Sequence, residues 1–235
     1  MAPGMQNPRS DGTGRSRVSL QRFLVHALSV TAVVLVLLAA SPRPSFQAFQ
    51  ASQGPVPGAV AERMREHSWH DGCPTTIAEL SYLRLSYFGF DGAVHQGELV
   101  VHREVATDVI SIFKALFEQH FPIEKMRLID AYAGDDDASM ADNNTSAFNC
   151  RFVPGKPGVF SKHSSGHAID VNPRLNPMIV GAAVFPPSAA AFVDRKGTAP
   201  GLIRPGDPTT SAFLRYGWIW GGTWQSMKDY QHFEK

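Results

Sequence analysis

Residues 161–170 read Ser-Lys-His-Ser-Ser-Gly-His-Ala-Ile-Asp. The stretch sets His163 and Asp170 seven residues apart, on either side of a turn at Gly166. Histidine nitrogens and aspartate oxygens are common protein ligands of zinc. A histidine and an acid placed on either side of a glycine turn therefore indicate part of a metal site.

A second acid and histidine lie far downstream, where Asp229 precedes His232 by three residues. A catalytic zinc site needs three protein ligands and one open position. His163, Asp170 and His232 satisfy that requirement. Such a site also needs a polar group that is not a ligand and that moves protons to and from the bound water. Asp229 is placed for that role.

The pattern S-x-H-x-x-G-x-A-x-D, followed later by an acid-x-x-His pair, resembles the signature of the VanY-like zinc D,D-carboxypeptidases and L-alanyl-D-glutamate endopeptidases. Every fixed position of the first motif is present, and the resemblance covers roughly residues 69–234. The ending, residues 220–234, is similar to the endopeptidase branch. The resemblance implies a fold of the hedgehog and DD-peptidase type.

The resemblance also implies a role for each residue of the two motifs. His163, Asp170 and His232 are the implied zinc ligands. Asp229 is the implied general base, which activates a zinc-bound water and then protonates the leaving amine. The implied activity is hydrolysis of peptide bonds in the stem peptides of bacterial peptidoglycan. A non-catalytic zinc-binding module on the same fold, which binds the cell wall or a partner, is the alternative.

Substrate contacts are expected from five further residues. An arginine upstream of the first motif binds the substrate carbonyl or carboxylate in the resembling family, and Arg151 is the candidate, with Arg127 as the alternative. The usual Gly-Tyr-Arg context of that arginine is absent here. Ser161 is expected to support the substrate or the metal shell. Trp220 and Trp224 belong to an aromatic cluster and are expected to wall the substrate cleft, with a place in the core as the alternative.

Other histidines and acids receive structural interpretations. His167 occupies a variable position of the motif and is not expected to be a ligand. His102 has no acidic or histidine partner at ligand spacing in the sequence, so a structural role is expected. The acidic run 135–137 lacks the spaced oxygen pattern of a calcium loop. It is expected to be a solvated loop, and a position at the border of the substrate groove is left open.

The N-terminal region carries an export signal. Residues 1–22 are polar, contain four arginines and are expected to be disordered, and residues 23–40 read FLVHALSVTAVVLVLLAA. A positive region followed by such an apolar run indicates a signal peptide, and the run is also long enough for a marginal membrane anchor. A buried core helix is disfavoured because the run has no polar face. Cleavage and anchoring both predict an extracytoplasmic location, with membrane contact only if the segment is retained.

Pro, Gly, Ala, Ser and Gln dominate residues 41–60, which are expected to be a linker. The peptidase domain is expected to span residues 61–235. Cys73 and Cys150 are the only two cysteines. In an oxidising compartment such a pair often forms a disulfide, and a Cys73–Cys150 bridge is the prediction, with two unpaired buried thiols as the alternative.

Periodicity predicts an α+β fold, in which a small antiparallel sheet packs with one main helix. The expected strands are residues 82–90, 98–101, 126–132 and 168–171, and the expected helices are residues 104–120 and 209–216, the second capped by Thr or Ser. Residues 134–149 and 172–208 are expected to be mostly loop.

The composition fits an ordinary globular protein. The chain has 235 residues, of which 43% are hydrophobic and 18% charged, and its formal net charge is +1. This balance gives no indication of a nucleic-acid partner. The expected partners are peptidoglycan peptides, the expected cofactor is Zn²⁺, and the expected state is a monomer.

Overall fold

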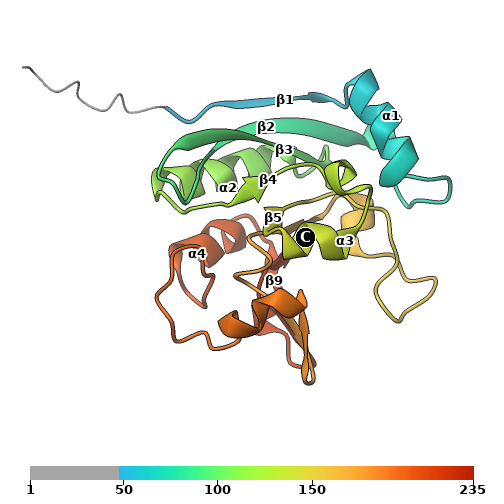
Figure 1. Ribbon diagram of the computed structural model, residues 1–235. Helices are drawn as coiled ribbons and strands as arrows, with labels where there is room; N and C mark the ends of the chain where they lie inside the picture. The colour runs from blue at the N-terminus through green and yellow to red at the C-terminus, as the bar shows by residue number, and fades with distance from the viewer. Residues whose placement is uncertain (1–47) are drawn as a thin grey trace, which may run out of the picture. The chain divides into compact units, whose positions relative to one another are not determined.

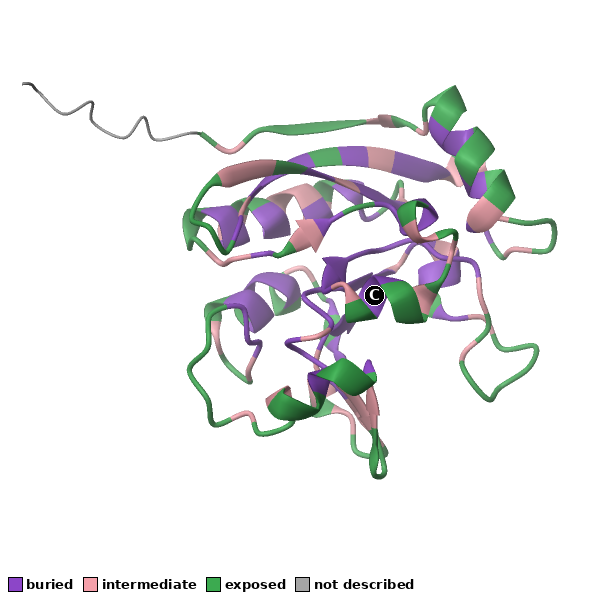
Figure 2. Cartoon of the chain, in the orientation of Figure 1, coloured by how far each residue is buried: buried purple, intermediate pink, exposed green. Residues whose placement is uncertain are grey.

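A hairpin of two long antiparallel strands, β2 (Leu80–Phe88) and β3 (Val94–His102), forms the first layer of the fold (Figure 1). Alternate side chains point into the core, and Leu83, Leu85 and Leu99 are fully buried, as the two-residue period of a strand requires. The helix α2 (Ala106–Glu118) packs its apolar face on this hairpin. Figure 2 shows buried residues where helix and sheet meet. The predicted hairpin, helix and α+β class are confirmed.

The computed structural model describes residues 48–235. The segments 1–22 and 23–40, with their expected disorder and export signal, lie outside the described residues. Within residues 48–235, no helix combines the length and the apolar character that crossing a membrane requires.

The third strand of this sheet, β1 (Ala51–Pro55), lies inside the stretch 41–60 that reads as a linker. It pairs antiparallel with β2, and its side chains are almost all exposed. Strand pairing uses backbone groups, so an exposed edge strand leaves no hydrophobic pattern in the sequence. The helix α1 (Gly58–His67) follows directly and buries Val60 and Met64. Ordered structure therefore begins before residue 61.

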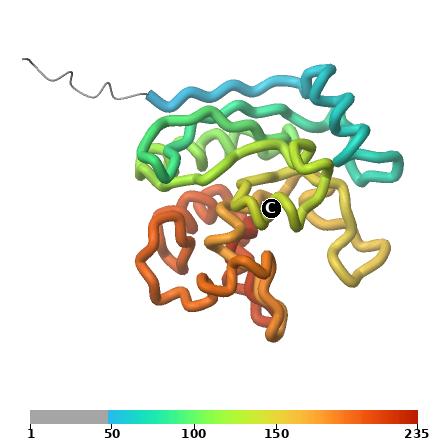
Figure 3. Tube along the Cα trace, in the orientation of Figure 1, coloured from blue at the N-terminus to red at the C-terminus, as the bar shows by residue number. Residues whose placement is uncertain are grey.

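The C-terminal half contains two smaller antiparallel sheets. Figures 1 and 3 show the course of this half in orange and red. In one sheet, the central strand β11 pairs with β6 and with β9; in the other, the central strand β7 pairs with β10 and with β8. The strand bounds are β6 (Ala168–Asp170), β7 (Met178–Val180), β8 (Ala183–Phe185), β9 (Ile219–Trp220), β10 (Lys228–Asp229) and β11 (His232–Glu234). The register sets His232 opposite Asp170 and Asp229 opposite Met178. Sheet pairing thus brings the two sequence motifs together.

Several short elements differ from the sequence-based expectations. The expected strand 126–132 is shortened to β4, which pairs in parallel with β5, and is followed by a 3₁₀ turn. The expected loops 134–149 and 172–208 contain a short helix, a hairpin and another 3₁₀ turn. The expected strand is replaced by β4 (Lys125–Met126) and η2 (Ile129–Tyr132). The expected loops contain α3 (Asp136–Ala141), β5 (Asn144–Thr145), the β7–β8 hairpin and η4 (Pro187–Phe192). They are too short to show a period in the sequence and depend on tertiary contacts.

The remaining helical elements include the expected helix near the C-terminus, α4 (Pro208–Leu214). Its N-cap is Asp207, whose carboxylate accepts a hydrogen bond from the Thr210 amide at 2.7 Å, where Thr or Ser was expected to cap. The short 3₁₀ turns are η1 (Ile77–Glu79), η3 (Lys162–Ser165) and η5 (Gly221–Thr223).

Cys73 and Cys150 are joined by a disulfide in this structure, with Cα atoms 6.0 Å apart, beside a small apolar cluster under α1.

Candidate functional site

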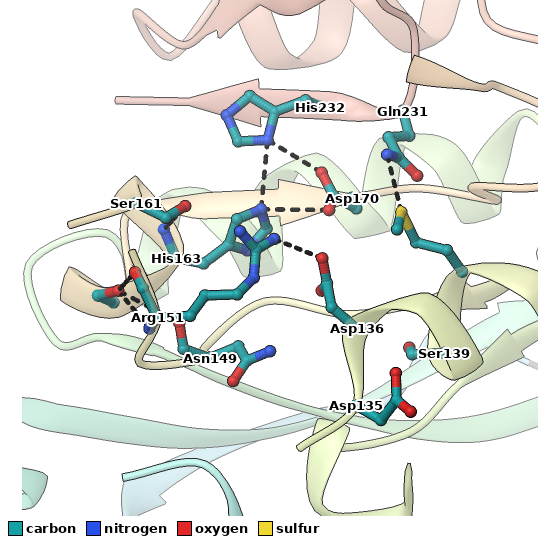
Figure 4. Close-up of polar contacts among 12 residues, drawn as sticks. Asp135, Asp136, Ser139, Asn149, Arg151, Ser161, His163, Asp170, Gln231 and His232 are labelled. Carbon is teal, nitrogen blue, oxygen red and sulfur yellow. Dashed lines mark hydrogen bonds and ion pairs between the residues drawn. The ribbon is translucent and has the colours of Figure 1, made fainter. Parts of the chain in front are cut away.

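Three side chains converge where the two motifs meet, and we call them the cleft triad: His163, Asp170 and His232 (Figure 4). The Asp170 carboxylate lies 3.2 Å from His163 Nε2 through one oxygen and 3.0 Å from His232 Nδ1 through the other. The two ring nitrogens lie 3.2 Å apart. All three residues are buried. Sequence reasoning predicted this grouping, and the structure brings these residues together.

The turn that carries His163 is built by two small residues of the first motif. Ser161 caps η3, where its hydroxyl accepts a hydrogen bond from the His163 amide at 3.3 Å. Gly166 ends the turn with φ of +73°, a conformation that glycine adopts without strain. A Cβ at Gly166 would lie 2.5 Å from the His102 amide nitrogen. The motif therefore needs glycine both for its backbone angle and for close packing against β3.

Each histidine of the cleft triad is oriented by its second ring nitrogen. His163 Nδ1 donates to the Ala147 carbonyl, because a carbonyl only accepts, so Nε2 carries the free lone pair. His232 Nε2 lies 3.1 Å from the Glu234 carboxylate, which leaves Nδ1 to face Asp170. Metal-binding histidines commonly hold their outer nitrogen in this way. The inner atoms are thus prepared to bind one cation.

The electrostatics of the cleft triad favour a positive charge at its centre. Burial alone would raise the pKa of Asp170, but the charges and hydrogen bonds of His163 and His232 hold that pKa far below its ordinary value. Burial alone would lower the pKa of His232, but hydrogen bonds to Asp170 and Glu234, with their charges, raise it to about 10. Two imidazoles and a carboxylate are also a donor set that zinc accepts. The residues present therefore fit a divalent metal.

Asp229 is a buried acid beside the cleft triad. Its Oδ1 atom has no hydrogen-bond partner among residues 48–235. Burial raises the pKa of Asp229 to about 7; the charge of Asp170 adds to this rise and that of His232 opposes it. A Cβ on Gly221 would lie 2.7 Å from the Asp229 carbonyl oxygen, so the η5 turn needs glycine to approach β10. A buried carboxyl with one unpaired oxygen and a pKa near neutrality can exchange protons with a reacting molecule.

The cleft triad and Asp229 line one cleft of about 700 Å³. Its lining includes residues of the β7–β8 hairpin, of the stretch 151–162, of α3 and of the C-terminal stretch 224–234. Polar groups along it come from Asp136, Asp137, Lys156 and Lys162. The apolar lining comes from Met140, Phe160, Met178, Val180, Phe185, Trp224 and Met227. A cleft with apolar walls and a few charged groups is suited to an extended polar chain such as a peptide.

The structure separates the two arginine candidates. Arg151 lines the cleft, and its guanidinium lies 2.7 Å from the Asp136 carboxylate. Its Nε atom is buried and has no hydrogen-bond partner among residues 48–235. Arg127 lines a different pocket, beside Arg63 and Arg84. Of the two, Arg151 alone lies at the site.

The two tryptophans are also separated. Trp224 lines the cleft, with its ring centroid 5.4 Å from that of His232. Trp220 is only 2% exposed, and its indole N–H donates to the Tyr230 carbonyl at 3.0 Å. Trp220 therefore lies in the core and does not wall the cleft as expected. The reason is its place on β9, where pairing with Phe233 turns the ring inward.

Sequence reasoning missed the role of Glu234 at the site and left the position of Asp136 at the border of the groove open. Glu234 lies two residues after His232 on the same strand, so both side chains share one face, a signal that the sequence does contain. Asp136 stands at the first position of α3, in a run that reads as a solvated loop. Its ion pair with Arg151 depends on the fold, and no sequence pattern indicates it.

Residues 154–235, about a third of the chain, match the family model described as D-alanyl-D-alanine carboxypeptidase. The matched range includes both motifs, so the predicted VanY-like resemblance is confirmed there. The match suggests a peptidase. No curated protein and no solved structure matches the chain.

Proposed function

With residues 154–235 assigned to the VanY-like D-alanyl-D-alanine carboxypeptidase family, we propose that this protein is an exported, zinc-dependent peptidase. Its substrates are the stem peptides of bacterial peptidoglycan. The observation that carries the proposal is the buried cleft triad beside Asp229, an acid with an unpaired carboxylate oxygen. The export signal at residues 23–40 supports a site of action in the cell wall.

His163 Nε2, His232 Nδ1 and one Asp170 oxygen are the atoms that would hold the metal. When bound, zinc supplies Lewis acidity and lowers the pKa of water towards about 7. The outer contacts to Ala147 and Glu234 hold both rings in the orientation that binding requires. These contacts fix the orientation of both rings, so metal binding is expected to require little movement of the two side chains.

Asp229 is the proposed proton carrier. As a carboxylate, it accepts a proton from the attacking water and then delivers that proton to the leaving amine of the cleaved bond. Its pKa, raised to about 7 by burial, suits both steps near neutral pH. The unpaired Oδ1 atom is the one available for this exchange.

Arg151 is the proposed group for the substrate carbonyl or carboxylate. Its positive charge stabilises the negative charge that develops on the carbonyl oxygen as water attacks. The ion pair with Asp136 holds the guanidinium at the cleft. Ser161, which caps the His163 turn, supports the metal site through the backbone.

A digest of purified muropeptides by the full-length protein, with products identified by mass spectrometry, tests the proposal. Release of D-alanine identifies a carboxypeptidase, and separation of L-alanine from D-glutamate identifies an endopeptidase. Either activity is expected to be lost to a chelator and restored by zinc. Stoichiometric zinc without turnover of any wall fragment would contradict the enzyme and support the alternative, a non-catalytic zinc-binding module. An active protein that is insensitive to chelator would contradict the metal.

A further inference from the structure

A second group with metal-binding chemistry lies outside the cleft. It consists of His102, Glu104 and His167, which we call the surface triad. One potential ligand atom from each residue lies within 4.8 Å of those of the other two. None of the three residues is among those that line the cleft. The surface triad is therefore not part of the site to which the proposed function is assigned.

The backbone holds the two histidines of the surface triad side by side. The His102 amide donates to the Gly166 carbonyl at 2.9 Å, and His167 follows Gly166 directly. The His167 amide in turn donates to the Lys162 carbonyl at 3.1 Å, at the start of the same turn. The two rings stack with centroids 4.6 Å apart and an angle of 27°. This arrangement is built by the motif turn and the end of β3.

The polar atoms of the surface triad point toward one another. His167 Nδ1 donates to the Ser165 carbonyl at 2.9 Å, which leaves Nε2 as the free lone pair. That Nε2 lies 3.9 Å from a carboxylate oxygen of Glu104. His102 Nδ1 accepts a hydrogen bond from the Glu104 amide at 3.4 Å and lies 3.5 Å from the same carboxylate oxygen. Holding the outer nitrogen of a histidine on a carbonyl is common at metal sites.

Charge and exposure also suit a cation. Burial, and less strongly the neighbouring His102, lower the pKa of His167, which favours its neutral ring. The side chains of His102 and His167 are 12% and 22% exposed, whereas that of Glu104 is 73% exposed. The rings are thus fixed and partly shielded, while the carboxylate is free to move onto an ion and solvent can supply a fourth ligand.

We propose that His102, Glu104 and His167 bind a divalent transition metal, with zinc as the probe, at a site independent of the cleft. Two imidazoles and one carboxylate are suitable ligands for zinc. With metal–ligand distances near 2.1 Å, the ligand atoms of a tetrahedral site lie about 3.4 Å apart, so the surface triad needs only a small closure. The bound ion would tie the motif turn to the end of β3.

Zinc stoichiometry tests this site. The full-length protein, dialysed against a zinc buffer, is expected to retain two equivalents by elemental analysis. His167→Gln and Glu104→Gln, made separately, are each expected to retain one equivalent and to keep the peptidase activity. His95→Gln is the matched control, because His95 is also a β3 histidine beside a carboxylate, that of Asp91 at 3.0 Å, but belongs to no such triad. It is expected to retain two equivalents.

The outcomes separate this inference from the proposed function. A wild-type protein that retains one equivalent, unaffected by either surface variant, would overturn the inference and leave the cleft site standing. One equivalent that is lost in both surface variants would support the inference and contradict the cleft metal. Circular dichroism of each variant shows whether it is folded. The visible spectrum of the cobalt-loaded protein independently reports the loss of a metal ligand. A cobalt spectrum that both surface variants leave unchanged would overturn the inference.

Discussion

The cleft triad and the surface triad use the same donor set, two histidines and a carboxylate, in opposite surroundings. In the cleft triad all three residues are buried and the facing atoms lie 3.0–3.2 Å apart. In the surface triad the carboxylate of Glu104 is mostly exposed, and its nearer oxygen lies 3.5 Å from His102 Nδ1 and 3.9 Å from His167 Nε2. The cleft triad also has beside it a buried acid, Asp229, whose Oδ1 atom has no hydrogen-bond partner among residues 48–235. The two triads therefore share the same types of ligand. The cleft triad, which is the proposed catalytic group, differs in its closely spaced, buried atoms and in the proton carrier beside it.

The largest expected effect comes from removing that proton carrier. Asp229→Asn keeps the size of the side chain but cannot accept a proton, so kcat is expected to fall by about 10²- to 10⁴-fold, the usual contribution of a general base. The cleft triad stays complete, so zinc content is expected to stay unchanged. Muropeptide turnover and elemental analysis measure the two quantities on one preparation.

Asp71→Asn is the matched control for this variant, because Asp71 is an exposed acid that does not line the cleft. Its turnover is expected to equal that of the wild-type protein. Full activity of the Asp229 variant would refute the assigned proton carrier. Loss of zinc together with activity would instead assign Asp229 to the metal.

The next effect concerns preorganisation within the cleft triad. Glu234 holds the outer nitrogen of His232 at 3.1 Å. Removing such a partner typically weakens metal affinity or activity by about 10- to 100-fold, so Glu234→Gln is expected to raise the zinc dissociation constant of the cleft by that factor. Competition with a chromophoric chelator measures it. An unchanged affinity would show that burial alone organises the cleft triad.

The residues of the cleft triad and Asp229 can be grouped from the sequence, whereas those of the surface triad cannot. His163, Asp170, Asp229 and His232 lie in two local patterns, so their grouping is readable before any fold is known. The surface triad is not, because His102 comes from a strand that meets His167 only through tertiary packing.

The same limit applies to two other expectations. Trp220 and Trp224 look equivalent in sequence, but pairing of β9 with β11 buries the first and leaves the second at the cleft. The composition of residues 41–60 predicts a linker. It does not reveal β1, because the mostly exposed residues of this strand contribute backbone pairing and no hydrophobic pattern. Regular periods and motifs are local properties, whereas strand partners and short irregular elements are set by the whole fold.

A smaller effect is expected on stability from the surface triad. A ligand that binds only the folded state stabilises it by about 2.7 kcal/mol at a hundredfold excess over its Kd, which raises Tm by several degrees. After the cleft is filled, further zinc is therefore expected to raise the Tm of the wild-type protein but not that of His167→Gln. Differential scanning calorimetry in a zinc titration measures the difference. Equal shifts in both proteins would show that the second increment has another source.

The smallest expected effect is on the free energy of unfolding. It comes from a buried carboxylate that lacks the two histidine partners found in the cleft triad. Asp130 is buried and accepts a hydrogen bond from the Ser68 hydroxyl at 2.8 Å. Burial raises the pKa of Asp130 above its ordinary value of 3.8, and the Ser68 hydrogen bond only partly opposes this. Above pH 3.8 the unfolded chain releases this proton before the folded protein does, so stability falls as pH rises.

Asp130→Asn removes that titration, while its side-chain oxygen can still accept from Ser68. The variant is expected to gain stability relative to the wild-type protein as pH rises from 4 to 7, and each unit by which the folded pKa is raised contributes about 1.4 kcal/mol. Urea unfolding at several pH values measures the gap, with Asp71→Asn as the exposed control. A gap that widens toward low pH would mean that the Asp130 carboxylate is stabilised in the fold, as that of Asp170 is by its histidines.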